Sequence, residues 1–306
     1  MWAQFTMRSR LAIDTLPGSG RTCVVMPVTV PDSLDAVLAV LAADPGATLV
    51  AGGTDLMVEV NDGRRPLEHV VMVGRVPELR AVRVEPGHVV IGAAATYTDL
   101  LEGPVAELAP ALARAARTVG SPQIRNAGTI GGNLATASPA GDTLPVLVAM
   151  GATIEIARGA QRRLVAIDEF FTGPKRSVLE PGELLLGVRV PVRRGAQDYL
   201  KVGVRNAMVI AVASLAIAVD LDARTVGIGL GSVGPTPLAA HDACAWLAAR
   251  ASWRDDGLEV GAGDADEFAE RVQAVTLAID DHRSTAQYRR HAVGVMARRA
   301  LRRCAL

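Results

Sequence analysis

The run of glycine, alanine and small polar residues at 121–142 constrains the fold of this 306-residue chain more than any other feature of its sequence. No helical or strand periodicity fits the run, so we expect a long loop there. A loop of this length inside a compact domain is usually either functional or disordered. Apolar residues on both sides argue against disorder, and the sequence therefore predicts a functional loop.

Two short glycine-rich segments indicate what such a loop binds. One is 51–56 (AGGTDL), which follows an apolar strand expected at 48–50, and the other is 128–133 (GTIGGN). Paired glycines permit positive φ and close approach of the main chain, and successive backbone N–H groups can then line a concavity for a phosphate or diphosphate. Either segment alone is equally well explained as a tight turn between strands. The two together favour nucleotide binding.

The rest of the chain alternates helices and strands and changes character near residue 192. Residues Leu34, Val37, Leu38 and Leu41 have the spacing of an amphipathic helix that stops at Pro45-Gly46. The other expected elements are short strands between 67 and 100 with a hairpin turn at 86–87, a helix from about 104 to 119, strands at 153–157, 184–190, 209–219 and 225–230, and helices at about 237–250, 264–280 and 285–303. This pattern predicts an α+β fold with an extension at 1–21, a domain at 22–192 and a second domain at 193–306.

Composition excludes several classes of function. Lys and Arg number 32 and Asp and Glu also 32, and only 3% of residues are aromatic, so nothing indicates a nucleic-acid partner. The three cysteines and five histidines lack metal-ligand spacing, which predicts no metal site on this chain and free thiols in a reducing cytoplasm. The longest apolar run, 207–219, is too short for a membrane span.

A further glycine motif, 229–234 (GLGSVG), fits the GxGxxG pattern of dinucleotide-binding folds. That fingerprint opens directly into a helix and has an acidic residue about 20 positions later, at the end of the next strand. Here Pro235 and Pro237 follow at once, and Asp255 lies in a polar stretch with no strand before it. We therefore expect a strand end and a loop at 229–234. By pattern alone, Lys201 and Arg205 are explained as well by solvated charges at the entrance of the next strand as by a functional role.

Residues 123–133 (QIRNAGTIGGN), continued by 137–142 (ASPAGD), resemble the second flavin loop of the molybdenum hydroxylase family, which includes xanthine dehydrogenase and carbon monoxide dehydrogenase. Residues 51–56 resemble the first flavin loop of that family. Weaker similarities occur at 168–174, 183–185, 201–214 and 284–290. The resemblance covers about 23–303 and implies the separate medium subunit. Its fold is a two-lobed FAD-binding domain of the vanillyl-alcohol-oxidase type, with lobes at about 22–90 and 91–192, followed by a small α+β domain like that of carbon monoxide dehydrogenase flavoproteins.

The resemblance also implies a FAD site between the lobes. Its residues are Leu49, Val50, Ala51, Gly52, Gly53, Thr54, Asp55, Leu56, Val119, Ile124, Thr129, Gly132, Asn133, Thr136, Asp142, Leu184, Leu185 and Lys201. Backbone amides of both glycine loops are expected to hold the diphosphate, and the aliphatic side chains are expected to contact the rings. Asp142 is expected to bind a ribose or ribityl hydroxyl. Lys201, the one candidate for tuning the flavin, is expected at the isoalloxazine edge, where a cation stabilises negative charge on the reduced ring.

Neither glycine loop contains histidine or cysteine, so the resemblance implies that FAD is bound non-covalently. The chain is too short and too poor in cysteine to hold molybdopterin or [2Fe–2S] clusters as well. Those are expected on a large and a small partner subunit, in a cytoplasmic enzyme that is a dimer of heterotrimers. In that setting FAD would pass electrons from the clusters to an external acceptor. Two alternatives stay open: a nucleotide-binding module without a redox role, and a self-contained flavin oxidase.

Overall fold

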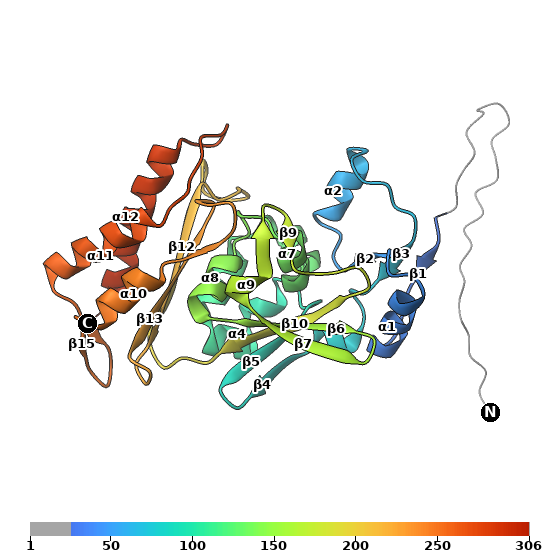
Figure 1. Cartoon of the computed structure of the whole chain (residues 1–306), viewed down its shortest axis with the longest axis horizontal. Helices are drawn as coiled ribbons and strands as arrows, with labels where there is room; N and C mark the ends of the chain where they lie inside the picture. Colours follow the sequence, from blue (N-terminus) through green and yellow to red (C-terminus); the bar gives the residue numbers. More distant parts are fainter. Residues whose placement is uncertain (1–25, 306) are drawn as a thin grey trace.

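The structure, a computed structural model, describes residues 26–305 and arranges them as two lobes and a C-terminal domain in a row (Figure 1). The N-terminal extension expected at 1–21, and Cys23, lie outside the described residues. Within 26–305, no helix is both long and apolar enough to cross a membrane.

The first lobe is a parallel three-stranded sheet with strand order β1-β3-β2. Its elements are β1 (Val28–Thr29), α1 (Leu34–Ala43), β2 (Thr48–Val50), α2 (Leu56–Asn61), β3 (Val70–Met72) and α3 (Pro77–Arg80). Helix α1 begins as its sequence predicts, because the Ser33 side chain accepts a hydrogen bond from the Ala36 N–H and caps the first turn. Val37, Leu38 and Leu41 then face the core of this lobe.

The second lobe is an antiparallel five-stranded sheet of order β4-β5-β10-β6-β7 with helices packed on it. Its elements are β4 (Val82–Glu85), β5 (His88–Gly92), the 3-10 helix η1 (Asp99–Leu101), α4 (Gly103–Leu108), α5 (Pro110–Arg117), α6 (Pro122–Ala127), α7 (Ile130–Thr136), α8 (Leu144–Met150), β6 (Thr153–Arg158), β7 (Gln161–Ala166), α9 (Ile167–Phe170), β8 (Phe171–Gly173), β9 (Arg176–Ser177) and β10 (Leu184–Pro191). The expected lobe boundary near residue 90 falls inside β5. It belongs before β4, because β4 and β5 form a hairpin that pairs with β10.

Two expectations for this lobe are wrong. The helix expected at about 104–119 is interrupted at Ala109, where Pro110 starts α5. The run 121–142 is not a single loop, since it contains α6 and α7. Both short helices have side-chain caps: the Ser121 side chain accepts a hydrogen bond from the Ile124 N–H, and the Thr129 side chain accepts one from the Gly132 N–H.

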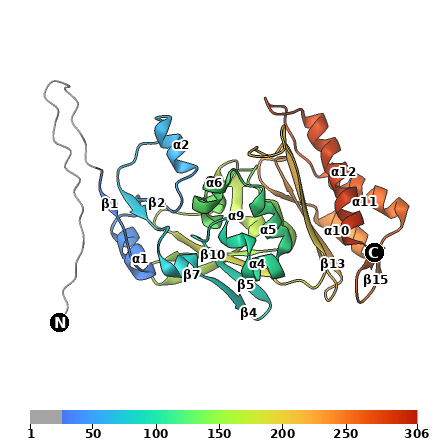
Figure 2. The ribbon, with the colours of Figure 1, turned by 180° about the vertical axis from the view of Figure 1, so that it is seen from behind.

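The C-terminal domain is an antiparallel sheet of order β11-β12-β13-β14, with helices on one face. Its elements are β11 (Gln197–Val202), β12 (Ala213–Asp220), β13 (Thr225–Gly231), β14 (Leu238–Ala239), α10 (His241–Ala248), β15 (Ser252–Trp253), β16 (Leu258–Glu259), α11 (Ala262–Ala274) and α12 (Ala286–Cys304). The expected β12–β13 hairpin is present, turning at residues 221–224. Figure 2, from behind, shows α10, α11 and α12 on the outer side of this sheet.

Two glycines of the GxGxxG match, Gly229 and Gly231, lie with Gly227 at alternate positions of β13. A Cβ atom at Gly227 would stand 1.9 Å from the Ala149 carbonyl oxygen, and one at Gly229 would stand 1.9 Å from that of Pro145. At Gly231 a Cβ would meet Ser214 Oγ and the Pro145 ring. Helix α8 of the second lobe thus packs directly on the backbone of β13. The motif serves packing between domains, as a strand end rather than a dinucleotide loop.

Candidate functional site

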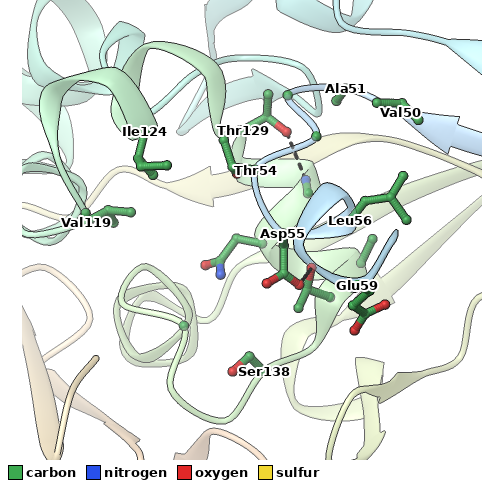
Figure 3. A pocket seen from close by; sticks show the side chains of 18 of the residues that line it. Val50, Ala51, Thr54, Asp55, Leu56, Glu59, Val119, Ile124, Thr129 and Ser138 are labelled. Atoms are coloured by element: carbon green, nitrogen blue, oxygen red, sulfur yellow. Dashed lines mark hydrogen bonds between the residues drawn. The ribbon is translucent and has the colours of Figure 1, made fainter. Parts of the chain in front are cut away.

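A cleft of about 930 Å³ lies between the two lobes, at the upper end of the range for small-molecule sites. It is bounded by the β2–α2 loop of the first lobe, by α6, α7 and the following loop of the second lobe, and by residues 208–210 of the C-terminal domain. Figure 3 shows the labelled residues around this space, with Val119 and Ile124 on one side and Val50 and Leu56 on the other.

The β2–α2 loop presents unpaired main-chain donors to the cleft. Within residues 26–305, the backbone N–H groups of Gly52, Gly53, Thr54 and Asp55 make no hydrogen bond, and all four residues line the cleft. Gly53 has φ of +69°, a left-handed conformation that side chains disfavour and that turns successive amides toward one side. Unpaired main-chain donors require water or a ligand. This loop is therefore a ready anion cradle.

The second glycine segment is built differently from the expectation. The first N–H groups of α7 are already used: Ile130 donates to Ala95 O, Gly131 to Ala93 O, and Gly132 to Thr129 Oγ1. The segment therefore offers side-chain donors in place of the expected amides. Two are suitable: the Thr129 hydroxyl keeps its own hydrogen, and Asn133 keeps its amide nitrogen because its Oδ1 accepts from Thr143.

Close approach of the two segments explains why Gly52 has no side chain. A Cβ on Gly52 would overlap the Ala127 carbonyl and stand 3.0 Å from the Gly128 nitrogen. A hydrogen bond of 3.1 Å from Thr136 Oγ1 to Asp55 Oδ2 ties the segments together on the other side. The two loops, 76 residues apart at Gly52 and Gly128, thus form one surface.

Asp142, also at the cleft, is fixed by the C-terminal domain. Its carboxylate accepts hydrogen bonds from Lys201 Nζ at 2.7 Å and from the Tyr199 hydroxyl at 2.9 Å, both on β11. Burial raises the pKa of the Asp142 carboxyl, and Lys201 and Tyr199 oppose that rise. Lys201 also donates to the Thr118 carbonyl, so two of its three ammonium N–H groups have partners. The C-terminal domain therefore helps to set the position of a cleft carboxylate.

Charged side chains stand at the rim of the cleft. Glu59 of α2 pairs with Lys175 at 2.8 Å and with Arg65 at 3.9 Å. Lys175 lies in the β8–β9 turn of the second lobe, so this exposed ion pair bridges the lobes beside the opening. The hydrogen bond from Lys175 lowers the pKa of Glu59. The two cations favour an anionic ligand, although exposed pairs contribute little to stability.

Fifteen of the predicted site residues line the cleft. They are Leu49, Val50, Ala51, Gly52, Gly53, Thr54, Asp55, Leu56, Val119, Ile124, Thr129, Gly132, Asn133, Thr136 and Asp142. The structure does not bring Leu184, Leu185 or Lys201 to the lining. Both leucines are core residues of β10, and Lys201 lies behind Asp142.

Sequence reasoning missed other lining residues. Tyr97 follows β5, Lys175 lies in a turn, and Met208, Val209 and Ile210 lie in the β11–β12 loop. No spacing pattern links these positions to the glycine loops. Among residues 26–305, no group of three or more His, Cys, Asp or Glu side chains is placed to hold a metal ion.

The chain matches two family models. The model described as "FAD binding domain in molybdopterin dehydrogenase" matches residues 23–193, and that described as "CO dehydrogenase flavoprotein C-terminal domain" matches 198–304. The change between them falls at the linker that precedes β11. Both domains of the chain are thus accounted for by known families.

Individual relatives agree with these matches. The nicotinate dehydrogenase FAD-subunit of Eubacterium barkeri is 36% identical over 185 residues, which are 58% of this chain and 62% of that protein. The carbon monoxide dehydrogenase medium chain of Hydrogenophaga pseudoflava is 32% identical over 274 residues, or 87% of this chain and 91% of that one. The solved structure of the Cu,Mo-CO dehydrogenase in its cyanide-inactivated form aligns with a TM-score of 0.82 at 30% identity, covering 95% of this chain and 99% of that chain.

Proposed function

Because this chain belongs to the family of FAD-binding domains of molybdopterin dehydrogenases, we propose that it is the flavin-carrying medium subunit of a heteromeric molybdenum hydroxylase. Its role in that enzyme is to hold FAD and to pass electrons from iron–sulfur clusters to an external acceptor. FAD supplies the redox chemistry when bound, and the protein supplies binding, orientation and the electrostatic surroundings.

The observation that carries this proposal is the row of unpaired amides at Gly52, Gly53, Thr54 and Asp55. Four successive N–H groups without partners among the described residues, turned by a glycine at positive φ, suit a diphosphate. Thr129 and Asn133 face the same space with side-chain donors. The residues of the cleft thus fit the anionic centre of FAD, and its volume suits a dinucleotide.

The remaining predicted contacts are assigned by position. Leu49 and Leu56 from the first lobe and Val119 and Ile124 from the second supply apolar surface for the rings of the cofactor. Asp142, held by Lys201, accepts a hydrogen bond from a sugar or ribityl hydroxyl. Lys201 then acts through Asp142 and positions it. This role differs from the direct contact to the flavin edge that the family resemblance implies.

The partners follow from the relatives. The relatives are named a medium chain of carbon monoxide dehydrogenase and a FAD-binding subunit of xanthine dehydrogenase, and the family resemblance implies a large molybdenum subunit and a small iron–sulfur subunit beside them. We propose the same two partners here, in a dimer of heterotrimers located in the cytoplasm. The organic substrate would bind to the large subunit, so no residue of this chain needs to contact it.

Flavin uptake tests the proposal directly. The full chain is mixed with FAD, freed of excess cofactor, and its visible absorbance is recorded before and after dithionite. We expect one flavin per chain, bleached by the reductant. Folded protein that takes up no flavin would contradict the proposal, bound flavin that dithionite does not reduce would favour the module without a redox role, and substrate turnover by this chain alone would favour the oxidase.

A matched pair of variants tests the amide cradle. Gly53→Ala and Gly63→Ala impose nearly the same strain, because φ is +69° at Gly53 and +68° at Gly63, and both lie in the β2–β3 connection. An alanine at positive φ costs about 1 kcal/mol in either case. Only Gly53→Ala should also weaken FAD binding, by about tenfold or more, since only Gly53 lies among the unpaired amides. Equal affinities for FAD in the two variants would contradict a role of these amides in binding FAD.

A further inference from the structure

Tyr97 is the one buried tyrosine of the described chain whose hydroxyl has no protein partner. Its side chain is 6% exposed and lines the cleft, yet the hydroxyl makes no hydrogen bond within residues 26–305. Tyr199, the other buried tyrosine, donates to Asp142. The hydroxyl oxygen is not enclosed in the protein but opens on the cleft, where water or a bound ligand can accept its hydrogen bond. The open position of Tyr97 therefore points to a ligand.

The main chain around Tyr97 holds the residue at the junction of the two glycine segments. The Tyr97 N–H donates to the Gly128 carbonyl at 3.0 Å, and Thr96 forms a bridge with Thr129. A Cβ on Gly128 would stand 2.8 Å from Cε2 of the Tyr97 ring. Gly52 approaches the peptide group that joins Ala127 to Gly128. The ring is thus fixed against the place where the two loops meet.

The electrostatic setting makes this hydroxyl a donor. Burial, with the nearby carboxylates of Asp142 and Asp55, raises the pKa of Tyr97 well above its ordinary value. The phenol therefore keeps its proton at neutral pH. Within residues 26–305 neither carboxylate accepts a hydrogen bond from the Tyr97 hydroxyl, since Asp142 accepts from Lys201 and Tyr199 and Asp55 accepts from Thr136, so this donor is available to a ligand in the cleft.

We propose that the Tyr97 hydroxyl donates a hydrogen bond to a diphosphate oxygen of the bound dinucleotide. The proposal rests on the FAD-binding function proposed above and adds a binding residue to it. The amides of Gly52, Gly53, Thr54 and Asp55 approach the diphosphate from the first lobe. On the opposite side the first amides of α7 are already paired, and Tyr97 supplies a donor there.

Tyr97→Phe tests this hydrogen bond, with Tyr288→Phe as the control. Tyr288 is on α12 and half exposed, so its variant makes the same chemical change away from the cleft. A hydrogen bond to a charged group corresponds to about a ten- to hundredfold change in Kd. We expect FAD to bind Tyr97→Phe more weakly by that factor and Tyr288→Phe with wild-type affinity. Because Tyr97 loses no protein partner, the melting temperature without FAD should stay within a few degrees of wild type.

Phosphorus NMR of bound FAD shows whether Tyr97 contacts the diphosphate or the flavin ring. The two ³¹P resonances should shift in Tyr97→Phe while the visible flavin spectrum stays unchanged. An unchanged Kd, or a changed flavin band with unchanged ³¹P resonances, would overturn the assignment. Failure of the wild-type chain to bind FAD would instead refute the proposed function, so the two failures are distinguishable.

A measurement on the unsubstituted chain covers the case in which Tyr97→Phe does not fold. The sequence has three tyrosines, at 97, 199 and 288, so ¹⁹F NMR of protein labelled with 3-fluorotyrosine gives three signals. Tyr288→Phe and Tyr199→Phe assign them. The Tyr97 signal should shift on addition of FAD and the Tyr288 signal should not. A Tyr97 signal that FAD leaves in place would overturn the proposal.

Discussion

Replacing Gly229 with alanine is expected to force the two domains apart. The added Cβ would stand 1.9 Å from the Pro145 carbonyl oxygen, and both atoms belong to the backbone framework, of β13 and of α8. Ordinary van der Waals contact begins at 3.4 Å, so α8 and β13 must separate by about 1.5 Å. No side-chain rotation can relieve the overlap, because neither atom is at the end of a flexible group.

The magnitude follows from what that separation does to the interface. A gap of 0.5 to 1 Å already removes a quarter to a half of a dispersion contact, so a gap of about 1.5 Å removes most of it along α8. Overpacking in cores costs about 1–3 kcal/mol, and the backbone position of this clash places Gly229→Ala at or above about 3 kcal/mol. The assay is urea unfolding followed by circular dichroism and by intrinsic fluorescence.

Gly263→Ala is the matched control. Gly263 lies in α11, a Cβ there meets no atom within 4 Å, and alanine is the better helix former. This variant should be neutral or more stable by up to about 1 kcal/mol. We expect Gly229→Ala to show a lower midpoint, or two separate transitions because the domains no longer unfold together. Equal stability of the two variants would refute the close approach of α8 to β13.

Two ion pairs that each contain a buried charge give further predictions. Lys201→Met leaves the Asp142 carboxylate buried without its cation and should cost about 3–5 kcal/mol at pH 8. This cost should shrink toward pH 5, because loss of Lys201 raises the pKa of Asp142 further and a protonated carboxyl is less costly to bury. Urea unfolding at pH 8 and pH 5 measures the cost, and an equal cost at both pH values would contradict this reasoning. Asp281→Asn should also destabilise by about 3–5 kcal/mol, since Arg289 is buried and loses its anion. Burial would raise the pKa of Asp281, but hydrogen bonds from Arg283 and Arg289 lower it overall. The stability of the wild type should therefore fall as the pH drops below about 3.8, whereas thermal melts of Asp281→Asn should lack this acid dependence.

Local signals in the sequence locate much of the fold. The strand at 48–50 and the helix from Leu34 are predicted correctly because their determinants are nearby: a capping serine, apolar spacing and a Pro-Gly stop. The β12–β13 hairpin is likewise marked by an aspartate-rich turn between two apolar runs. These features depend on a few neighbouring residues, so one sequence is enough to find them.

The helices within 121–142 are a different case. Ser121 and Thr129 cap them and Pro122 stands at a first helical position, so the start signals are present in the sequence. The helices have only six and seven residues, and α7 contains two glycines, so intrinsic propensity opposes them. Gly131 is tolerated because α7 packs against Ala93, where a Cβ would stand 2.5 Å from the carbonyl oxygen. Tertiary packing decides these two helices, and a single sequence does not contain that information in readable form.

The residues of the cleft also divide into those that local sequence predicts and those that only tertiary packing brings there. The glycine loops can be read from the sequence, whereas Tyr97 and the 208–210 loop reach the cleft through contacts between distant segments. The resemblance implies that Leu184 and Leu185 contact the rings of the cofactor, and their burial in β10 depends on pairing with distant strands that one sequence does not specify.

The interface at β13 and the cleft are physically connected, and this connection extends the Gly229 prediction. Asp142 lines the cleft, but both of its hydrogen-bond partners, Tyr199 and Lys201, are on β11 of the C-terminal domain. Docking of that domain and placement of Asp142 are therefore one equilibrium, and two linked processes must influence each other equally. If Gly229→Ala weakens docking, it must also weaken FAD binding, and FAD must in turn protect the docked state against urea. A Gly229→Ala protein that unfolds early yet binds FAD as tightly as wild type would mean that Asp142 contributes nothing to the cofactor.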